Sequence, residues 1–379
     1  MNAPAFTAID HEQMALALQL AAHGLYSTAP NPAVGCVVLD STGATVGTGW
    51  HRKAGEAHAE VLAIAAAGEA ARGGTAYVTL EPCAHHGRTP PCVEAVIRAG
   101  LRRVVAAMRD PNPRVAGTGL QQLREAGVEV AVGLLEREAR ELNRGFISRM
   151  ERGRPWVTVK MGASLDGRTA LADGASKWIT SGVARADVQK LRARASAVLT
   201  GIGTVLADDP ALTVREPELP LYGRQPLRVI FDARGQLLPT SRVVNDGYET
   251  LLMTSQQGAG QLQARGVHAQ TQLVVESLPV DANGRLDPRV ALQRLAEREC
   301  NEVLVEAGAR LAGSFIAAGL VDELVVYVAP TVLGDTARPV FLLPQPLRTL
   351  EERQNFVFHD LRRIGPDVRL TLRPAEAST

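Results

Sequence analysis

Three side chains in the first third of the chain have to meet at one point, and this requirement constrains the fold more than any other feature. They are one imidazole, His58, and two thiols, Cys83 and Cys92, all of which bind zinc well. Three protein ligands leave a tetrahedral zinc with one open position, whereas a structural zinc usually has a fourth Cys or His. We therefore predict a catalytic Zn²⁺ held by these three residues.

This ligand set predicts hydrolytic chemistry. Bound zinc lowers the pKa of a water molecule toward about 7 and so supplies hydroxide at neutral pH. A carboxylate beside the metal can carry the water's proton to a leaving group. Glu60, two residues after His58, is the candidate for this catalytic role. A ring carbon that bears an exocyclic amine would be a suitable target, with ammonia as the leaving group.

Local signals place these residues at helix starts. His58 and Glu60 can share a site only in the irregular first turn of an apolar helix, which we predict over residues 61–70. Cys92 follows two prolines and opens a second predicted helix, residues 93–99. A helix N-terminus also favours a thiolate there.

Length and composition limit the class of protein. A chain of 379 residues suggests two domains. Its 41 basic and 40 acidic residues give a net charge of +1, so we expect no general attraction to nucleic acid. No apolar run approaches the length of a membrane span, and the N-terminus lacks the pattern of a signal peptide. Four cysteines are no disulfide framework, which suits a reducing cytoplasm.

Alternating segments predict an α/β fold. A capping box at Asp10 and Gln13 would start the first helix, and the charged stretch 149–155 is the best candidate for a linker. We expect domains at residues 1–152 and 153–379, the first a three-layer α/β/α domain. In the first domain we expect strands at 34–40, 45–48, 75–80, 103–107 and 128–132 and further helices at 14–22, 119–126 and 136–143.

The second half has two glycine-containing strand ends. A strand at 197–200 runs into Gly201-Ile202-Gly203-Thr204, and one at 302–305 runs into a segment from Gly308 to Ser314. Glycines between a strand and a helix let backbone N–H groups approach a phosphate. The alternative is that they are ordinary turn residues, since neither segment has the full dinucleotide-binding spacing.

The run from Thr79 to Cys92 identifies a family. Its Pro-Cys and the earlier His-x-Glu resemble the signature of zinc deaminases that act on nucleobases, H-x-E with P-C-x-x-C, with the departure that a longer insert separates the two cysteines. With its long insert between the cysteines, the run resembles the deaminase half of the bifunctional riboflavin-biosynthesis deaminase/reductases, as do residues 30–35 and 49–51. This resemblance implies that Asn31 orients the pyrimidine and that His51, His85 and Arg88 contact the substrate.

Residues 160–180, 206–215 and 319–324 resemble the reductase half of the same family, which is similar in fold to dihydrofolate reductase and implies NADPH. Lys160 and Glu306 would manage protons while hydride passes from the nicotinamide to C1′ of the opened ribose. Ser176, Arg192, Leu212, Arg215 and Glu306 would face the phosphorylated substrate. The cofactor would be held by Gly162, Trp178, Thr204, Asp208, Gly308, Ala309, Arg310, Leu311, Ala312, Gly313 and Ser314.

The resemblance therefore implies two reactions. The first is zinc-dependent hydrolytic deamination of 2,5-diamino-6-(5-phosphoribosylamino)pyrimidin-4-one, and the second is NADPH-dependent reduction of the ribosyl group to ribityl. We expect a cytidine-deaminase-like α/β/α domain followed by a dihydrofolate-reductase-like α/β domain. We also expect a homo-oligomer that is cytoplasmic, with a small-molecule substrate and no nucleic-acid or membrane partner.

Two other functions remain open at this point. A nucleic-acid base deaminase fused to a redox-like domain predicts a basic groove with stacking aromatics, yet aromatic residues are only 4% of the chain. A zinc-stabilised binding module without turnover predicts a fourth protein ligand, for which His85 and His86 are the candidates.

Overall fold

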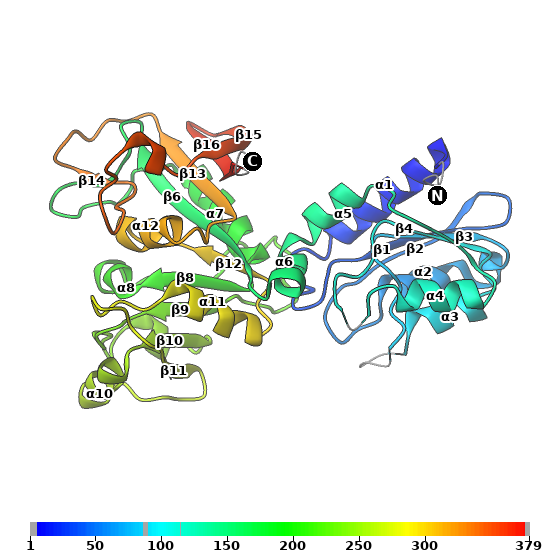
Figure 1. The fold of residues 1–379 in the computed structure, drawn as a ribbon, viewed down its shortest axis with the longest axis horizontal. Helices are drawn as coiled ribbons and strands as arrows, with labels where there is room; N and C mark the ends of the chain where they lie inside the picture. The colour runs from blue at the N-terminus through cyan, green and yellow to red at the C-terminus, as the bar shows by residue number, and fades with distance from the viewer. Residues whose placement is uncertain (1–5, 86–89, 114, 376–379) are drawn as a thin grey trace. The chain divides into compact units, whose positions relative to one another are not determined.

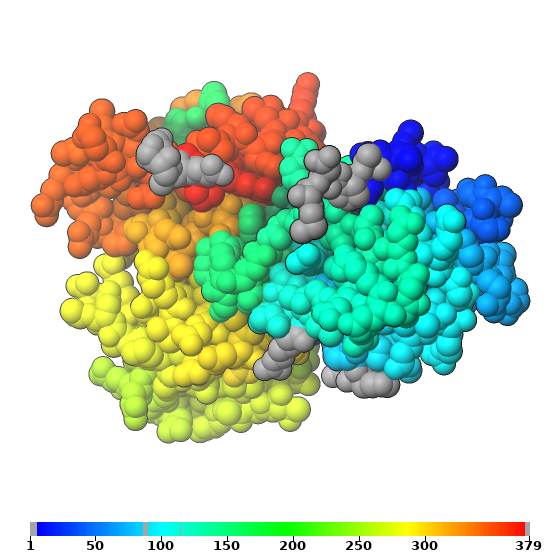
Figure 2. Space-filling view, turned by 45° about the vertical axis from the view of Figure 1, so that its right-hand side comes forward, coloured from blue at the N-terminus to red at the C-terminus, as the bar shows by residue number. Residues whose placement is uncertain are grey.

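The computed structural model describes residues 6–85, 90–113 and 115–375. Contacts divide the chain into two units (Figure 1): unit 1 is Met1–Gly153 with Pro220–Tyr222, and unit 2 is Arg154–Leu219 with Gly223–Thr379. In the space-filling view of Figure 2, unit 1 is mainly blue to cyan-green and unit 2 mainly green to red. Each unit thus takes most of its residues from one continuous stretch of the chain.

Unit 1 is built on a mixed sheet with the strand order β2-β1-β3-β4-β5. Strand β1 is antiparallel to both neighbours, and β3, β4 and β5 are parallel. All five residues of β1 are buried, as expected for a strand covered on both faces. The strands are β1 (Gly35–Leu39), β2 (Thr45–Trp50), β3 (Thr75–Val78), β4 (Arg103–Ala106) and β5 (Glu129–Val132).

Helices cover both faces of this sheet. Helices α1 (Ala8–Ala22) and α5 (Glu136–Leu142) lie on one face (Figure 1). Helices α2 (Ala59–Ala67), α3 (Cys92–Arg98) and α4 (Thr118–Glu125) lie on the other. The expected three-layer α/β/α arrangement is therefore confirmed. A short 3₁₀ helix, η1, completes the connection from α2 to β3 at residues 68–71.

The first helix begins earlier than the sequence predicted. Thr7 is its N-cap: the Thr7 hydroxyl accepts a hydrogen bond from the Asp10 N–H at 3.1 Å, and the Asp10 carboxylate accepts from the Thr7 N–H at 2.8 Å. The capping box predicted at Asp10 and Gln13 is wrong, because Asp10 is the third residue of the helix. Its carboxylate also binds Tyr77 and Arg103, which ties α1 to β3 and β4.

The predicted linker at 149–155 is also partly wrong. Helix α6 (Arg144–Arg152) continues through its first residues and ends at Gly153, which has a left-handed φ of 65°. Basic residues in the last turn favour a helix C-terminus, and glycine adopts the left-handed conformation without strain. Strand β6 begins shortly afterwards, at Trp156.

Unit 2 is built on a second, larger sheet with the order β11-β10-β9-β8-β12-β6-β13-β16-β15. It is parallel from β11 to β13, and β16 and β15 add antiparallel strands at one edge. A separate pair joins β7 (Arg168–Ala170) to β14 (Arg338–Pro339). The strands of the large sheet are β6 (Trp156–Ser164), β8 (Ala197–Gly201), β9 (Leu227–Phe231), β10 (Thr250–Thr254), β11 (Leu273–Ser277), β12 (Glu302–Val305), β13 (Glu323–Ala329), β15 (Phe356–Ile364) and β16 (Asp367–Pro374).

Helices α11 (Pro288–Glu297) and α12 (Ala309–Ala317) pack with one face of this sheet in a common apolar core. Helices α7 (Gly182–Arg194), α8 (Ile202–Asp208) and α10 (Gln256–Ala264) contribute to the apolar clusters on the other face. Two short helices, α9 (Arg242–Asn245) and η2 (Leu350–Glu352), lie in connections. Among the described residues, no helix is long and apolar enough to span a bilayer.

Candidate active sites

The structure brings the three predicted metal ligands together in unit 1. His58 is the N-cap of α2, Cys92 is the first residue of α3, and Cys83 lies in the loop after β3. Their ligand atoms lie within 4.8 Å of one another. They form the one group of this kind among the described residues.

The spacing of these atoms fits a tetrahedral zinc. Nδ1 of His58 lies 3.2 Å from Sγ of Cys92 and 3.6 Å from Sγ of Cys83. Bonds of about 2.3 Å to sulfur and 2.0–2.1 Å to nitrogen, at the tetrahedral angle, give a nitrogen–sulfur distance of about 3.6 Å. His85 is exposed and does not belong to the group, and His86 lies outside the described residues. The described ligands thus leave a fourth position open.

The charges of the two thiols also fit a cation. A hydrogen bond from Cys92 lowers the pKa of Cys83 to about 4, and the same contact raises the pKa of Cys92. The two sulfurs therefore hold one proton between them, which a divalent cation would displace. Glu60 is 4% exposed, and burial raises its pKa to about 7.

A chain of hydrogen bonds leads from the predicted substrate residues to the metal ligands. The amide nitrogen of Asn31 lies 3.1 Å from Nε2 of His51, and Nδ1 of His51 lies 3.1 Å from the carbonyl oxygen of Ala57. Because a carbonyl can only accept, His51 carries its proton on Nδ1 and accepts from Asn31. Burial lowers the pKa of His51, which favours the neutral ring. Its ring packs edge-on against that of His58, with centroids 5.1 Å apart.

Of the other two predicted substrate residues of unit 1, the structure describes His85 but not Arg88. Arg88 lies outside the described residues. His85 follows shortly after Cys83 and lies near Asp110. Burial raises the pKa of Asp110 to about 6, and the attraction of His85 opposes this shift.

Glu81 is a buried residue to which sequence reasoning assigned no role, although it lies inside the diagnostic run. Its carboxylate accepts hydrogen bonds from the backbone N–H groups of Gly117 and Gly119, both at 2.9 Å, and of Asp110 at 3.1 Å. It therefore anchors the loop before α4 next to Cys83. The signal that could have revealed it is its place directly before Pro82-Cys83.

In unit 2, adjacent strands bring the predicted catalytic residues together. Val305 of β12 pairs with Val159 of β6, so Glu306 and Lys160 follow at neighbouring positions. Arg192 of α7 binds both oxygens of the Glu306 carboxylate, through Nε at 2.5 Å and Nη2 at 3.0 Å. The side chains of both partners are only 11% exposed. This is a buried, bidentate ion pair beside a lysine.

The electrostatics of this cluster follow from burial and charge. Burial alone would raise the pKa of Glu306, but the attraction of Arg192, Lys160 and Arg215 outweighs it, and the pKa lies below its usual value. Burial lowers the pKa of Lys160, which the carboxylate of Glu306 partly offsets. Three cations thus surround one carboxylate, a charge balance that suits an anionic substrate.

The remaining predicted substrate residues lie in loops of unit 2. Arg192 also donates from Nη1 to the carbonyl oxygen of Thr213 at 3.0 Å, which fixes the segment that carries Leu212 and Arg215. Leu212 has a left-handed φ of 55° and a buried side chain. Leu212 therefore packs in an apolar cluster with Ala195, Val198 and Leu304. Ser176 is half-buried in the loop after β7.

Predicted cofactor residues follow the carboxyl ends of two neighbouring strands. Gly201 is the N-cap of α8 after β8, and Gly308 is the N-cap of α12 after β12. Thr204 lies in the first turn of α8, and a Cβ on Gly308 would meet no atom within 4 Å. Open backbone at two helix starts on one sheet edge fits the phosphates of a dinucleotide.

The later residues of the predicted loop are different. Ala312 and Gly313 are buried in α12, and a Cβ on Gly313 would lie 2.1 Å from the carbonyl oxygen of Leu342. Packing against another backbone segment therefore requires this glycine. The hydroxyl of Ser314 donates to the carbonyl oxygen of Arg310. Only the start of the segment is open to a ligand.

Trp178 and Asp208 are linked through Lys177, the residue before Trp178. Lys177, which precedes Trp178, binds the Asp208 carboxylate at 3.1 Å. Trp178 is 69% exposed, and the guanidinium of Arg185 lies 4.2 Å from the centroid of its ring. An exposed indole at this edge is suited to stacking on a planar ligand.

Comparisons with known proteins agree with both units. Residues 7–108 match the cytidine and deoxycytidylate deaminase zinc-binding region, and residues 155–370 match the RibD C-terminal domain. Fold and sites together define a zinc-dependent pyrimidine deaminase joined to a reductase. The riboflavin biosynthesis protein RibD of Escherichia coli K12 is 50% identical over 372 residues, which cover 96% of this chain and 99% of the relative. The chain belongs to the RibD family of bifunctional riboflavin-biosynthesis deaminase/reductases.

Solved structures support the same conclusion. RibD of Acinetobacter baumannii, form 2, has a TM-score of 0.87 and 42% identity, and 97% of this chain covers 99% of that one. A diaminohydroxyphosphoribosylaminopyrimidine deaminase/5-amino-6-(5-phosphoribosylamino)uracil reductase from Thermotoga maritima has a TM-score of 0.84 and 34% identity, with the same coverage. The predicted bifunctional activity is thus confirmed, with zinc and NADPH as cofactors.

Proposed function

We propose how the residues of each unit share the two reactions. The observation that carries this proposal is the cluster of His58, Cys83 and Cys92 beside the buried carboxyl of Glu60. When bound, zinc supplies a water activated at neutral pH, and NADPH supplies the hydride for the second reaction. The protein's own residues position the substrates and move protons.

In unit 1, His58, Cys83 and Cys92 hold the metal, and Glu60 takes a proton at its carboxyl oxygen and delivers it toward the leaving ammonia. The Asn31 amide retains its oxygen and one N–H for the pyrimidine ring, because only one N–H is used on His51. His51 fixes the direction of that amide, and His85 and Arg88 contact the substrate beyond the ring. The substrate is 2,5-diamino-6-(5-phosphoribosylamino)pyrimidin-4-one.

In unit 2, Lys160 and Glu306 donate and accept protons as the ribosyl group is reduced to ribityl. Arg192 and Arg215 hold the anionic substrate, together with Ser176 and Leu212. The attraction of both arginines to the Glu306 carboxylate supports this role. The cofactor lies along the sheet edge at Gly162, Trp178, Thr204, Asp208 and the segment from Gly308 to Ser314, with its phosphates at the open start of α12.

We also propose a homo-oligomer that assembles through unit 2. Strand β15 is an edge strand of the large sheet, and its exposed side chains include Val357, Phe358 and Leu361. These are 52%, 69% and 63% exposed. An exposed apolar edge strand is normally covered by another chain or protected from it.

The functional boundary lies between residues 152 and 153, one residue before the point at which contacts divide the two units, and each unit carries one activity. The family-model matches, at residues 7–108 and 155–370, support this division because they fall on opposite sides of it. The protein works in the cytoplasm, where the four free thiols, two of them at the metal site, stay reduced.

The test is to substitute Glu60→Gln and follow ammonia release and NADPH oxidation separately. Zinc content should stay at the wild-type level, because the three ligands are intact. Ammonia release should fall by about 10²–10⁴-fold, the usual value of a general acid–base. Glu69→Gln, at an exposed carboxylate in the same unit, is the control and should keep full activity. Wild-type ammonia release by Glu60→Gln would exclude its role.

A further inference from the structure

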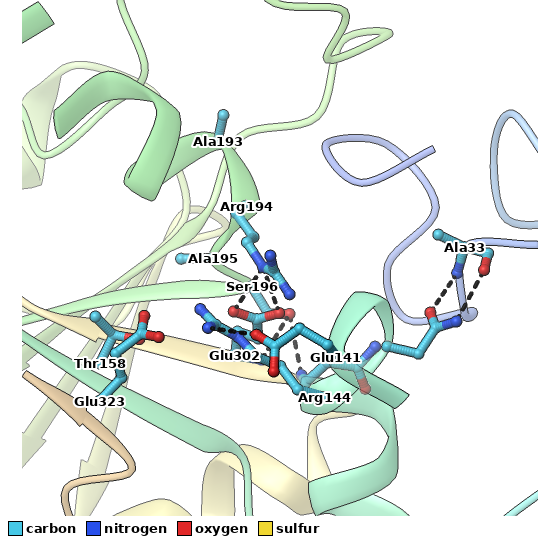
Figure 3. Close-up of polar contacts among 12 residues, drawn as sticks. Ala33, Glu141, Arg144, Thr158, Ala193, Arg194, Ala195, Ser196, Glu302 and Glu323 are labelled. Atoms are coloured by element: carbon cyan, nitrogen blue, oxygen red, sulfur yellow. Dashed lines mark hydrogen bonds and ion pairs between the residues drawn. The ribbon is translucent and has the colours of Figure 1, made fainter. Parts of the chain in front are cut away.

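The loop that carries Asn31 is held from a distant part of unit 1. Oδ1 of Asn143 accepts a hydrogen bond from the Ala33 N–H at 2.8 Å, and its amide nitrogen donates to the Ala33 carbonyl oxygen at 2.9 Å. Figure 3 shows both contacts at the backbone of Ala33. Asn143 lies between α5 and α6 and is 5% exposed. A second contact comes from α6, where Arg149 donates to the carbonyl oxygen of Pro30 at 3.4 Å.

The amide side chain of Asn143 is well suited to this pair of contacts. Ala33 is 3% exposed, so its N–H and C=O groups both need a protein partner or an enclosed water. The carboxamide supplies one acceptor and one donor in one plane, as a neighbouring strand would. Without it, two buried backbone groups lose their partners, which is more costly than the loss of exposed hydrogen bonds. The loop would then move to find other partners.

Hydrogen bonds connect this loop to the residues beside the metal ligands, so a shift of the loop would also shift Asn31 and His51. Asn31 lies two residues from Ala33 and donates to Nε2 of His51. Nδ1 of His51 in turn donates to the carbonyl oxygen of Ala57, the residue before His58. The direction of the Asn31 amide therefore depends on the backbone that Asn143 holds.

We propose that Asn143 is a positioning residue for deamination, which fixes residues 30–33 so that Asn31 meets the pyrimidine ring. Asn143 acts through the loop and does not touch the substrate. This inference rests on the role proposed above for Asn31.

The experiment compares Asn143→Ala, Asn31→Ala and the double variant in the full-length zinc-loaded protein. Asn143→Ala should lower kcat/KM for ammonia release by about tenfold or more, mostly through KM, since buried backbone partners are lost. Zinc content and NADPH-dependent reduction of the deaminated substrate should not change. Because Asn143 acts through Asn31, the double variant should be no worse than Asn31→Ala alone.

Other outcomes distinguish the positioning role of Asn143 from the substrate-binding role of Asn31. Losses that multiply in the double variant, or an unchanged kcat/KM in Asn143→Ala, would overturn the positioning role. Full activity of Asn31→Ala would instead remove the proposed function of Asn31. Tyr77→Phe is the matched control, because it removes a buried hydrogen bond to Asp10 in the same unit. It should lower the unfolding temperature and leave kcat/KM unchanged.

A second variant serves if Asn143→Ala does not fold. Asn143→Asp keeps an acceptor for the Ala33 N–H but has no donor for the Ala33 carbonyl oxygen. Its kcat/KM for ammonia release should also fall, with zinc retained. Wild-type kcat/KM in this variant would refute the inference equally.

Discussion

Substitution of Glu306→Gln tests the reductase site most directly. The change removes a buried negative charge that binds Arg192 at 2.5 and 3.0 Å. Breaking a buried ion pair by neutralising one partner costs about 3–5 kcal/mol, because the other charge is left without compensation. We expect a stability loss of about 3 kcal/mol, the lower end, since the glutamine oxygen can still accept one hydrogen bond from Arg192.

The effect on reduction should be larger than on stability and confined to one activity. Loss of a proton-managing group lowers the rate by about 10²–10⁴-fold. NADPH oxidation with the deaminated substrate measures this effect, and ammonia release with the diamino substrate should stay at the wild-type level. The pKa of Lys160 should fall further, because the attraction that opposes the effect of burial is lost. Any residual reduction that requires protonated Lys160 should then decline at a lower pH.

Strand β12 offers a matched control for this prediction. Glu302, its first residue, forms a partly buried ion pair with Arg194, whose Nε lies 2.8 and 3.0 Å from the two carboxylate oxygens (Figure 3). Glu302→Gln should destabilise unit 2 to a similar degree and leave the kcat/KM of reduction nearly unchanged. An equal loss of reduction in both variants would refute the catalytic role of Glu306. Equal losses of deamination and reduction in Glu306→Gln would refute the assignment of one activity to each unit.

Three further predictions concern the metal, the packing of α12 and acid stability. Cys83→Ser should lose zinc, measured by metal analysis, and ammonia release, while reduction of the deaminated substrate continues; loss of both activities would contradict independent units. Gly313→Ala should lower the unfolding temperature by the equivalent of about 1–3 kcal/mol, because its Cβ would overlap the Leu342 carbonyl oxygen; unchanged stability would contradict this packing. Burial would raise the pKa of Asp10, but hydrogen bonds from Arg103 and other neighbours hold it well below its usual value of about 3.9. This carboxylate therefore stabilises the fold above about pH 4 and loses that contribution as the pH falls. Asp10→Asn should be less stable at neutral pH and lose less on acidification; parallel unfolding curves over pH would contradict this.

Much of the fold was predictable because its signals are local. The strands of unit 1 follow short apolar segments bounded by turns, and all five expected there occur in the sheet. The start of α1 was not predictable to the residue, because Thr7 and Asp10 both resemble N-caps and only the contacts of Asp10 with Tyr77 and Arg103 decide between them. Helix α6 was missed because it is short, follows α5 directly at Asn143, and ends in Arg149-Met150-Glu151-Arg152, a charged stretch that also suits a linker.

The candidate sites show the same difference between residues marked by a local pattern and residues that only long-range contacts reveal. His58, Cys83 and Cys92 could be recognised because their residue types and spacing carry the chemistry, and the structure brings them together. Asn143 could not, because its contact with Ala33 joins positions 110 residues apart and no local pattern marks either one.

Hydrogen bonds between Cys83 and the start of α3 hold the two ends of the insert between the cysteines together. Cys83 accepts hydrogen bonds at Sγ from the Cys92 N–H and at its carbonyl oxygen from the Val93 N–H. Glu81 secures the upstream side by accepting from the backbone N–H groups of Asp110, of Gly117 and of the first turn of α4, whereas α3 secures the downstream side. Lengthening a loop whose ends are already fixed adds only about 0.6 kcal/mol per doubling. Changes of length between His85 and Pro90 should therefore cost little as long as Pro91, the N-cap of α3, is kept, and protein engineers could use them to change which molecules reach the metal.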